Sequence, residues 1–171
     1  MRSRGGWIAL TALAGTGWLI HAQARASVAK QFVGAWRLVS TEQRLADGTT
    51  RPAPAFGPNG VGYLLYTESN RMCALLMDPT RPKWDDRQTA PPDTVLRSAY
   101  NGLAAYCGTY DVNIKEGYVV HHVELDKSPN AVGTDRKRFF TFSGNRLVLR
   151  PAPPLPAGVV DYSLTWERVE K

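Results

Sequence analysis

Two adjacent histidines, His121 and His122, are the side chains of this sequence best suited to acid–base chemistry or metal binding. A neutral imidazole can act as a general base or bind a metal ion. The pair lies in an alternating apolar segment that predicts a strand, and neighbouring residues of a strand point to opposite faces. We therefore expect His121 inside the fold and His122 outside. Such a pair cannot chelate one ion, so we predict no metal site.

A run of positive charge, Arg136-Lys137-Arg138, also falls in a predicted strand. Alternation sends Lys137 outward and the two arginines inward, with Arg136 near the mouth of the fold. An isolated buried charge is very costly, so Arg138 needs a partner. That partner is either an acidic or enolate group of a ligand, or a tyrosine hydroxyl together with an acid of the protein.

Signatures of the common enzyme classes are missing from the sequence. It has no Gly-x-Ser-x-Gly motif, no paired catalytic carboxylates, no phosphate-binding loop and no Cys-x-x-Cys motif. His121 is the one candidate catalytic residue. A lone interior histidine is, however, more often a hydrogen-bonded core residue than a base. We predict no cofactor.

Short alternating apolar segments separated by turn residues predict an all-β fold, an eight-stranded antiparallel up-and-down barrel with one short helix. Closure removes the exposed edges of the sheet. The strands are expected at residues 34–44, 63–67, 71–77, 105–113, 118–125, 134–142, 146–150 and 160–169. The helix is expected after Pro92, packed on or capping the sheet, because apolar residues recur there at helical spacing: Val95, Leu96, Ala99, Tyr100 and Leu103.

Alternation also predicts which side chains line the interior. On the first strand these are Leu38 and Ser40, and on the strand with the histidines the apolar face extends to Leu125. On the second strand either Tyr63 with Leu65 or Leu64 with Tyr66 faces inward. The interior is then mainly apolar with a few polar groups, as small-molecule sites are. The candidate ligand-binding residues are His121, Arg138, Tyr63, Tyr106, Tyr110 and Phe140.

Residues 1–26 are predicted to be a cleaved signal peptide, and residues 27–171 one domain. Arg2 and Arg4 precede an apolar run that is shorter than the roughly 20 residues that span a bilayer, and small-x-small cleavage sites follow. We expect a periplasmic or secreted protein without stable membrane insertion of the mature chain. Loss of the three arginines of the signal reduces the formal net charge from +6 to +3, too little to imply nucleic-acid binding. The sequence makes no prediction of the oligomeric state.

Two cysteines, Cys73 and Cys107, remain in the predicted domain. Both fall on the outer face of sequential strands, so a disulfide is geometrically allowed, and an exported protein permits one. The alternative is two buried free thiols. A bridge across this separation would stabilise the fold by roughly 3 to 4 kcal/mol.

Several motifs of this chain resemble those of the bacterial lipocalin-like domain family. Gly34-Ala35-Trp36 is similar to the Gly-x-Trp signature of lipocalins, and Arg168 stands where their arginine packs across the tryptophan ring. The family pattern is also matched by Gly62-Tyr63-Leu64-Leu65-Tyr66-Thr67, Tyr110, His121-His122-Val123-Glu124, Pro129-Asn130, Val132-Gly133-Thr134-Asp135 and Leu164-Thr165-Trp166-Glu167-Arg168. The resemblance implies a barrel with a ligand cavity and structural roles for Gly34, Trp36 and Arg168. It implies no catalytic residues, and the family pattern lacks both cysteines.

The leading hypothesis is an exported binding protein that holds a small, hydrophobic and acidic or hydroxylated molecule in the barrel. The alternative is a barrel enzyme of the isomerase or cyclase type, in which His121 moves a proton and Arg138 stabilises negative charge. A third possibility is a filled barrel that binds nothing.

Overall fold

The computed structural model describes residues 28–85, 87 and 90–170, so the predicted signal peptide over residues 1–26 lies outside the described residues. A short helix covers residues 28–32. The elements that follow are β1 (Gly34–Leu45), β2 (Thr50–Pro52), β3 (Val61–Tyr66), β4 (Arg71–Met77), α2 (Asp93–Asn101), β5 (Leu103–Asn113), β6 (Tyr118–Asp126), the 3-10 helix η1 (Pro129–Ala131), β7 (Asp135–Ser143), β8 (Arg146–Pro151) and β9 (Val159–Arg168).

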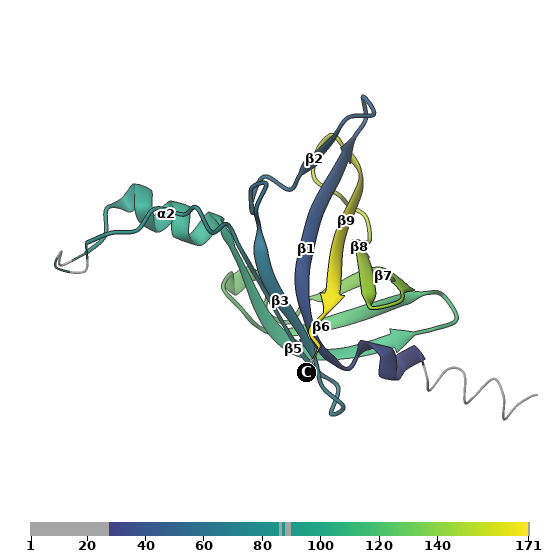
Figure 1. Ribbon diagram of the computed structural model, residues 1–171. Coiled ribbons are helices and arrows are strands. Elements are labelled where there is room, and N and C mark those ends of the chain that lie inside the picture. Colours follow the sequence, from purple (N-terminus) through teal and green to yellow (C-terminus); the bar gives the residue numbers. More distant parts are fainter. Residues whose placement is uncertain (1–27, 86, 88–89, 171) are drawn as a thin grey trace, which may run out of the picture.

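The strands close into an antiparallel barrel (Figure 1). Each strand from β3 to β8 pairs with the next strand along the chain, and β1 pairs with both β3 and β9. These eight strands are the predicted up-and-down barrel, and the fold class is confirmed. The three-residue strand β2, which pairs with the end of β1, was not predicted. Closure creates the enclosed interior in which the candidate site lies.

A β-bulge in β1 changes which residues of that strand face inward. Leu38 pairs with Trp166, but Ser40 pairs with the next residue of β9, Thr165, so one residue of β1 is unpaired. A bulge shifts the alternation by one position. Thr41 is therefore buried and Ser40 is exposed. The prediction that Ser40 faces the interior was wrong.

A second bulge lies in β6. Gly108 pairs with Val123 and Cys107 pairs with Leu125, which leaves Glu124 as the extra residue. Leu125 is 67% exposed instead of lining the interior, so its predicted orientation was wrong. After the bulge, the side chains of β6 point to the opposite faces from those that unbroken alternation predicts.

An aromatic cluster fills one end of the barrel. Phe32, from the short helix before β1, is fully buried, and its ring packs edge-on at 5.0 Å from the ring of Phe140 and 4.9 Å from that of Phe142. The indole N–H of Trp36 donates to the carbonyl oxygen of Phe32 at 2.8 Å. These aromatic side chains fill this end of the barrel, and the interior cavity described below lies toward the other end.

Arg168 covers the outer side of that aromatic cluster. Its guanidinium carbon lies 4.2 Å from the centre of the Trp36 ring, and its Nη1 donates to the carbonyl oxygen of Val33 at 2.8 Å. Gly34 has φ 131°, and a Cβ there would lie 2.7 Å from Nη1 of Arg168. The Gly-x-Trp sequence thus makes room for the arginine that closes this end.

Helix α2 projects away from the barrel with the segment that precedes it (Figure 1). None of its residues is buried, and Leu96 and Tyr100 are exposed. It is held by the preceding segment, since Nη1 of Arg81 donates to the carbonyl oxygen of Ala99 at 3.0 Å. The expectation that the helix packs on or caps the sheet was wrong. No helix within residues 28–170, as far as these are described, is long and apolar enough to cross a membrane.

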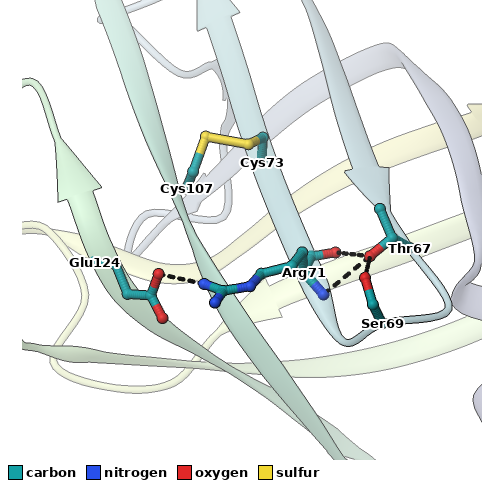
Figure 2. Close-up of polar contacts among 6 residues, drawn as sticks. All are labelled: Thr67, Ser69, Arg71, Cys73, Cys107 and Glu124. Carbon is teal, nitrogen blue, oxygen red and sulfur yellow. Dashed lines mark hydrogen bonds and ion pairs between the residues drawn. A yellow bond between two sulfur atoms is a disulfide. The ribbon is translucent and has the colours of Figure 1, made fainter.

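Cys73 and Cys107 form a disulfide on the outer face of the barrel (Figure 2). They are direct partners in the β4–β5 pairing, with Cα atoms 4.1 Å apart. The structure therefore contains the bridge and not two free thiols. Figure 2 also shows the ion pair between Arg71 and Glu124 on the same face.

Candidate functional site

A cavity of about 110 Å³ lies in the interior, on the side of the aromatic cluster that remains open. Its polar wall residues are Tyr106, His121, Arg136, Arg138 and Tyr162. The remaining wall residues are apolar apart from the indole N–H of Trp166: Phe56, Leu64, Ala74, Leu76, Ala104, Leu149, Pro151, Leu164 and Trp166. Seven strands contribute to it, so the site exists only in the closed barrel.

His121 lies at the centre of a buried hydrogen-bond network. It is 1% exposed, its Nε2 lies 2.6 Å from the hydroxyl of Tyr66, and its Nδ1 lies 2.9 Å from the hydroxyl of Tyr106. Burial lowers the pKa of His121 to about 3, with further lowering by the positive charges of Arg138 and Arg136. The imidazole is therefore neutral at pH 7, with one ring N–H and one ring nitrogen that accepts.

The same surroundings limit what His121 can do chemically. A general base works best when its pKa lies near the working pH, and a pKa of about 3 makes His121 a weak base at neutral pH. Burial also raises the pKa of Tyr66 well above its usual value, so this phenol stays protonated. The network is thus a set of neutral donors and acceptors.

Arg136 has a carboxylate partner within the protein. Its Nη2 donates to the carboxylate of Asp126 at 2.6 Å, and its guanidinium carbon lies 4.2 Å from the centre of the Tyr106 ring. The side chain of Asp126 is 4% exposed. Alternation along an unbroken strand places Asp126 outside, and the bulge at Glu124 brings it in, so the sequence did not reveal this pair.

Arg138, by contrast, has no carboxylate partner in the described part of the chain. Its hydrogen bond within the protein runs from Nη1 to the carbonyl oxygen of Lys137, at 3.0 Å. Lys137 itself points outward, with its ammonium 3.7 Å from the centre of the Tyr118 ring. A guanidinium carries five N–H donors, and one protein acceptor is found for those of Arg138, a partly exposed residue of the cavity wall.

The indole of Trp166 adds a second unsatisfied donor. Trp166 is 2% exposed, and its Nε1 is buried with no hydrogen-bond partner among the described residues. The other orphaned buried atom found there, Oε1 of Gln43, does not belong to the cavity wall. Buried polar groups are nearly always paired, so an orphaned N–H beside a cavity indicates a missing acceptor.

The structure separates the candidate ligand-binding residues into two groups. Tyr106, His121 and Arg138 meet in the cavity wall, while Tyr110 and Phe140 do not line it. Phe140 packs against Phe32 at the closed end, and the hydroxyl of Tyr110 donates to the carbonyl oxygen of Thr67 at 3.0 Å.

Tyr63 lies outside the barrel altogether. It is 53% exposed, whereas Leu64 and Tyr66 of the same strand are buried. This decides the alternative left open for β3 and excludes Tyr63 from the cavity. Trp166 and Tyr162, which also line the cavity, were not among the predicted ligand-binding residues.

His122 lies on the outer face, between two aspartates. Its Nδ1 lies 2.7 Å from Asp135 and its Nε2 3.1 Å from Asp111. The hydrogen bond with Asp135 is the main cause of a raised pKa of His122. No group of three or more side chains arranged for metal binding occurs in the described residues.

A closed eight-stranded barrel whose apolar cavity contains a few polar groups is typical of barrels that bind small molecules. A family model for the lipocalin-like domain matches residues 33–169, and the chain belongs to this family. No protein of curated function is similar in sequence. Among solved structures, a mutant of the fluorescent protein UnaG matches with 12% identity and a TM-score of 0.35, over 84% of this chain and 99% of that one. A likeness at this level supports no argument about function.

Proposed function

We propose that this protein binds a small, largely hydrophobic molecule with an acidic or hydroxyl group inside the barrel. The observation that carries the proposal is the position of Arg138, a cation in the cavity wall without a carboxylate partner in the described chain. Arg138 is partly buried, and a charge that loses water without gaining a partner is costly, so it is retained more readily where a ligand pairs with it. The membership of the lipocalin-like family agrees with a container role.

Export is the second part of the proposal. The features of residues 1–26 are those of a signal peptide, and the disulfide between Cys73 and Cys107 is typical of proteins in oxidising compartments. We propose that the protein acts in the periplasm or outside the cell.

The enzyme alternative is less well supported. It needs His121 as a base, and a histidine whose pKa lies at about 3 accepts a proton poorly at neutral pH. The third possibility, a filled barrel, is opposed by the cavity of about 110 Å³.

The test compares binding to the purified protein with binding to a variant whose cavity is filled. Isovalerate and isoamyl alcohol, which share one branched carbon skeleton, are titrated by calorimetry. Ala74 lies in the cavity wall, so Ala74→Phe should weaken binding of both probes about tenfold or more. Leu75→Phe, on the outer face of the same strand, is the matched control and should leave both affinities unchanged. Equal binding by all three proteins would exclude the cavity as the site.

A further inference from the structure

We infer that the ligand has a carboxylate or similar oxyanion head, held jointly by Arg138, the indole N–H of Trp166 and the hydroxyl of Tyr106. The inference rests on the proposed function and narrows its ligand class to compact acids. It also assigns Trp166 and Tyr106 as the residues that determine specificity.

The network contains one proton more than its own hydrogen bonds use. Tyr66 and Tyr106 each carry an O–H, and the neutral imidazole of His121 carries one N–H, which makes three donors. Two hydrogen bonds join the three side chains. One tyrosine donates to the imidazole and the other accepts from it, so the accepting tyrosine keeps a free O–H.

The surroundings identify Tyr106 as the tyrosine with the free O–H. Tyr106 belongs to the cavity wall, while Tyr66 does not and packs against the rings of Phe32 and Tyr110. A free O–H on Tyr66 would be buried without a partner among the described residues, which is the more costly arrangement. Tyr66 therefore donates to Nε2 of His121, and Nδ1–H donates to Tyr106. The remaining O–H of Tyr106 is available to the cavity.

Three residues that carry donors of different kinds line one cavity: Arg138, Tyr106 and Trp166, whose indole N–H is buried without a partner among the described residues. The buried carboxylate of Asp126 is already bound to Arg136 and to the backbone N–H of Ser128. A carboxylate only accepts hydrogen bonds and offers about four lone-pair sites, so one such group can satisfy all three donors. An alcohol leaves the charge of Arg138 unpaired.

The size of the cavity limits the rest of the ligand. A dry cavity of about 150 Å³ holds benzene, so about 110 Å³ corresponds to a ligand body of about four to six heavy atoms. The wall beyond the donors is aliphatic and aromatic, which favours a short branched or cyclic hydrocarbon body. A long-chain fatty acid would have to leave most of its chain outside.

The experiment follows the Trp166 indole resonance in a ¹⁵N–¹H spectrum of the full protein, assigned with Trp166→Phe, during titration with isovalerate, isoamyl alcohol and decanoate. The indole of Trp36, which already donates to Phe32, is the internal control. We expect isovalerate to shift the Trp166 resonance and to bind about tenfold or more tighter than isoamyl alcohol and decanoate. Trp166→Phe and Tyr106→Phe should each reduce isovalerate affinity about five- to tenfold and change alcohol affinity less than about twofold.

Tyr110→Phe is the matched control variant, because the hydroxyl of Tyr110 is bonded to Thr67 away from the cavity. If the alcohol binds as tightly as the acid, or the Trp166 resonance does not respond to bound isovalerate, the oxyanion inference is wrong and the proposed binding function stands. Tighter binding of decanoate overturns the compact ligand class. If none of the probes binds, the proposed function itself fails. The affinity comparison among the three probes uses the unchanged protein, so a variant that does not fold leaves that part of the test intact.

Discussion

The hydroxyl of Tyr106 lies 2.9 Å from Nδ1 of His121, in the wall of the barrel cavity. The other ring nitrogen bonds to Tyr66, so both nitrogens of a buried, neutral histidine are used. On the proposal above, His121 positions Tyr106 so that its free O–H serves the ligand. The histidine then contributes to binding without acting as a base.

Acid should destabilise the protein through His121. The folded-state pKa of about 3 lies below the ordinary value of 6.5, so between these pH values the unfolded chain binds a proton that the folded protein does not. The contribution of His121 to stability is present above pH 6.5 and is lost as the pH falls toward 3. From pH 7 to pH 5 the loss is about 2 kcal/mol. Urea unfolding at several pH values measures it.

The matched variant for that experiment is His121→Gln. It should be less stable at pH 7, because the network is disturbed, but its stability should fall less between pH 7 and pH 5. An equally steep fall in the variant would show that other groups carry the pH dependence.

Removal of Arg138 should weaken acid binding and stabilise the empty protein. Arg138→Met keeps an apolar stem but removes the unpaired charge, so affinity for isovalerate should fall about tenfold or more, and that for isoamyl alcohol less than about threefold. The free energy of unfolding should rise by about 1 to 2 kcal/mol. Calorimetry and urea unfolding give the two values.

Arg136→Met is the informative comparison, since it removes the partner of the buried carboxylate of Asp126. This variant should lose about 3 kcal/mol of stability. If both arginine variants change stability in the same direction, Arg138 has a partner and is not free for a ligand.

How far the sequence predicts this site depends on the regularity of each strand. Alternation correctly places His121, Arg136 and Arg138 inside because β7 and the first part of β6 are regular. The bulge at Glu124 cannot be read from apolar alternation, because Leu125 continues the apolar pattern. The residue that permits this bulge lies on the neighbouring strand, β5.

Gly108 permits the bulge, because two backbones approach closely there. A Cβ at Gly108 would lie 1.8 Å from the carbonyl oxygen of His122, so the bulge needs glycine on the opposite strand. Phe32 was missed for another reason: it precedes the first strand and enters the barrel from its end, where strand alternation makes no prediction.

Loss of the disulfide should destabilise the barrel without opening the cavity. Cys73 and Cys107 lie 34 residues apart, and a loop of this length corresponds to about 3 to 4 kcal/mol. The double variant Cys73→Ser, Cys107→Ser should lose this amount in urea unfolding and keep its isovalerate affinity within about twofold. A loss below about 1 kcal/mol, or two free thiols in the unreduced protein, would contradict the bridge.

The closed end depends on the fit between Gly34 and Arg168. Gly34→Ala forces the guanidinium off the Trp36 ring and strains a backbone with φ 131°, so it should lose about 2 kcal/mol or more. Gly48→Ala is the control for the backbone alone, because its φ is also positive and its Cβ would meet nothing. Thermal unfolding of the two variants compares them. Equal losses would mean that the contact with Arg168 adds nothing.

A crystal structure of the protein with isovalerate would show the binding mode itself. We expect the ligand inside the barrel, with its carboxylate oxygens within hydrogen-bond distance of Arg138, Tyr106 and the indole nitrogen of Trp166. An isovalerate bound outside the barrel, or one whose carboxylate points away from Arg138, would contradict it.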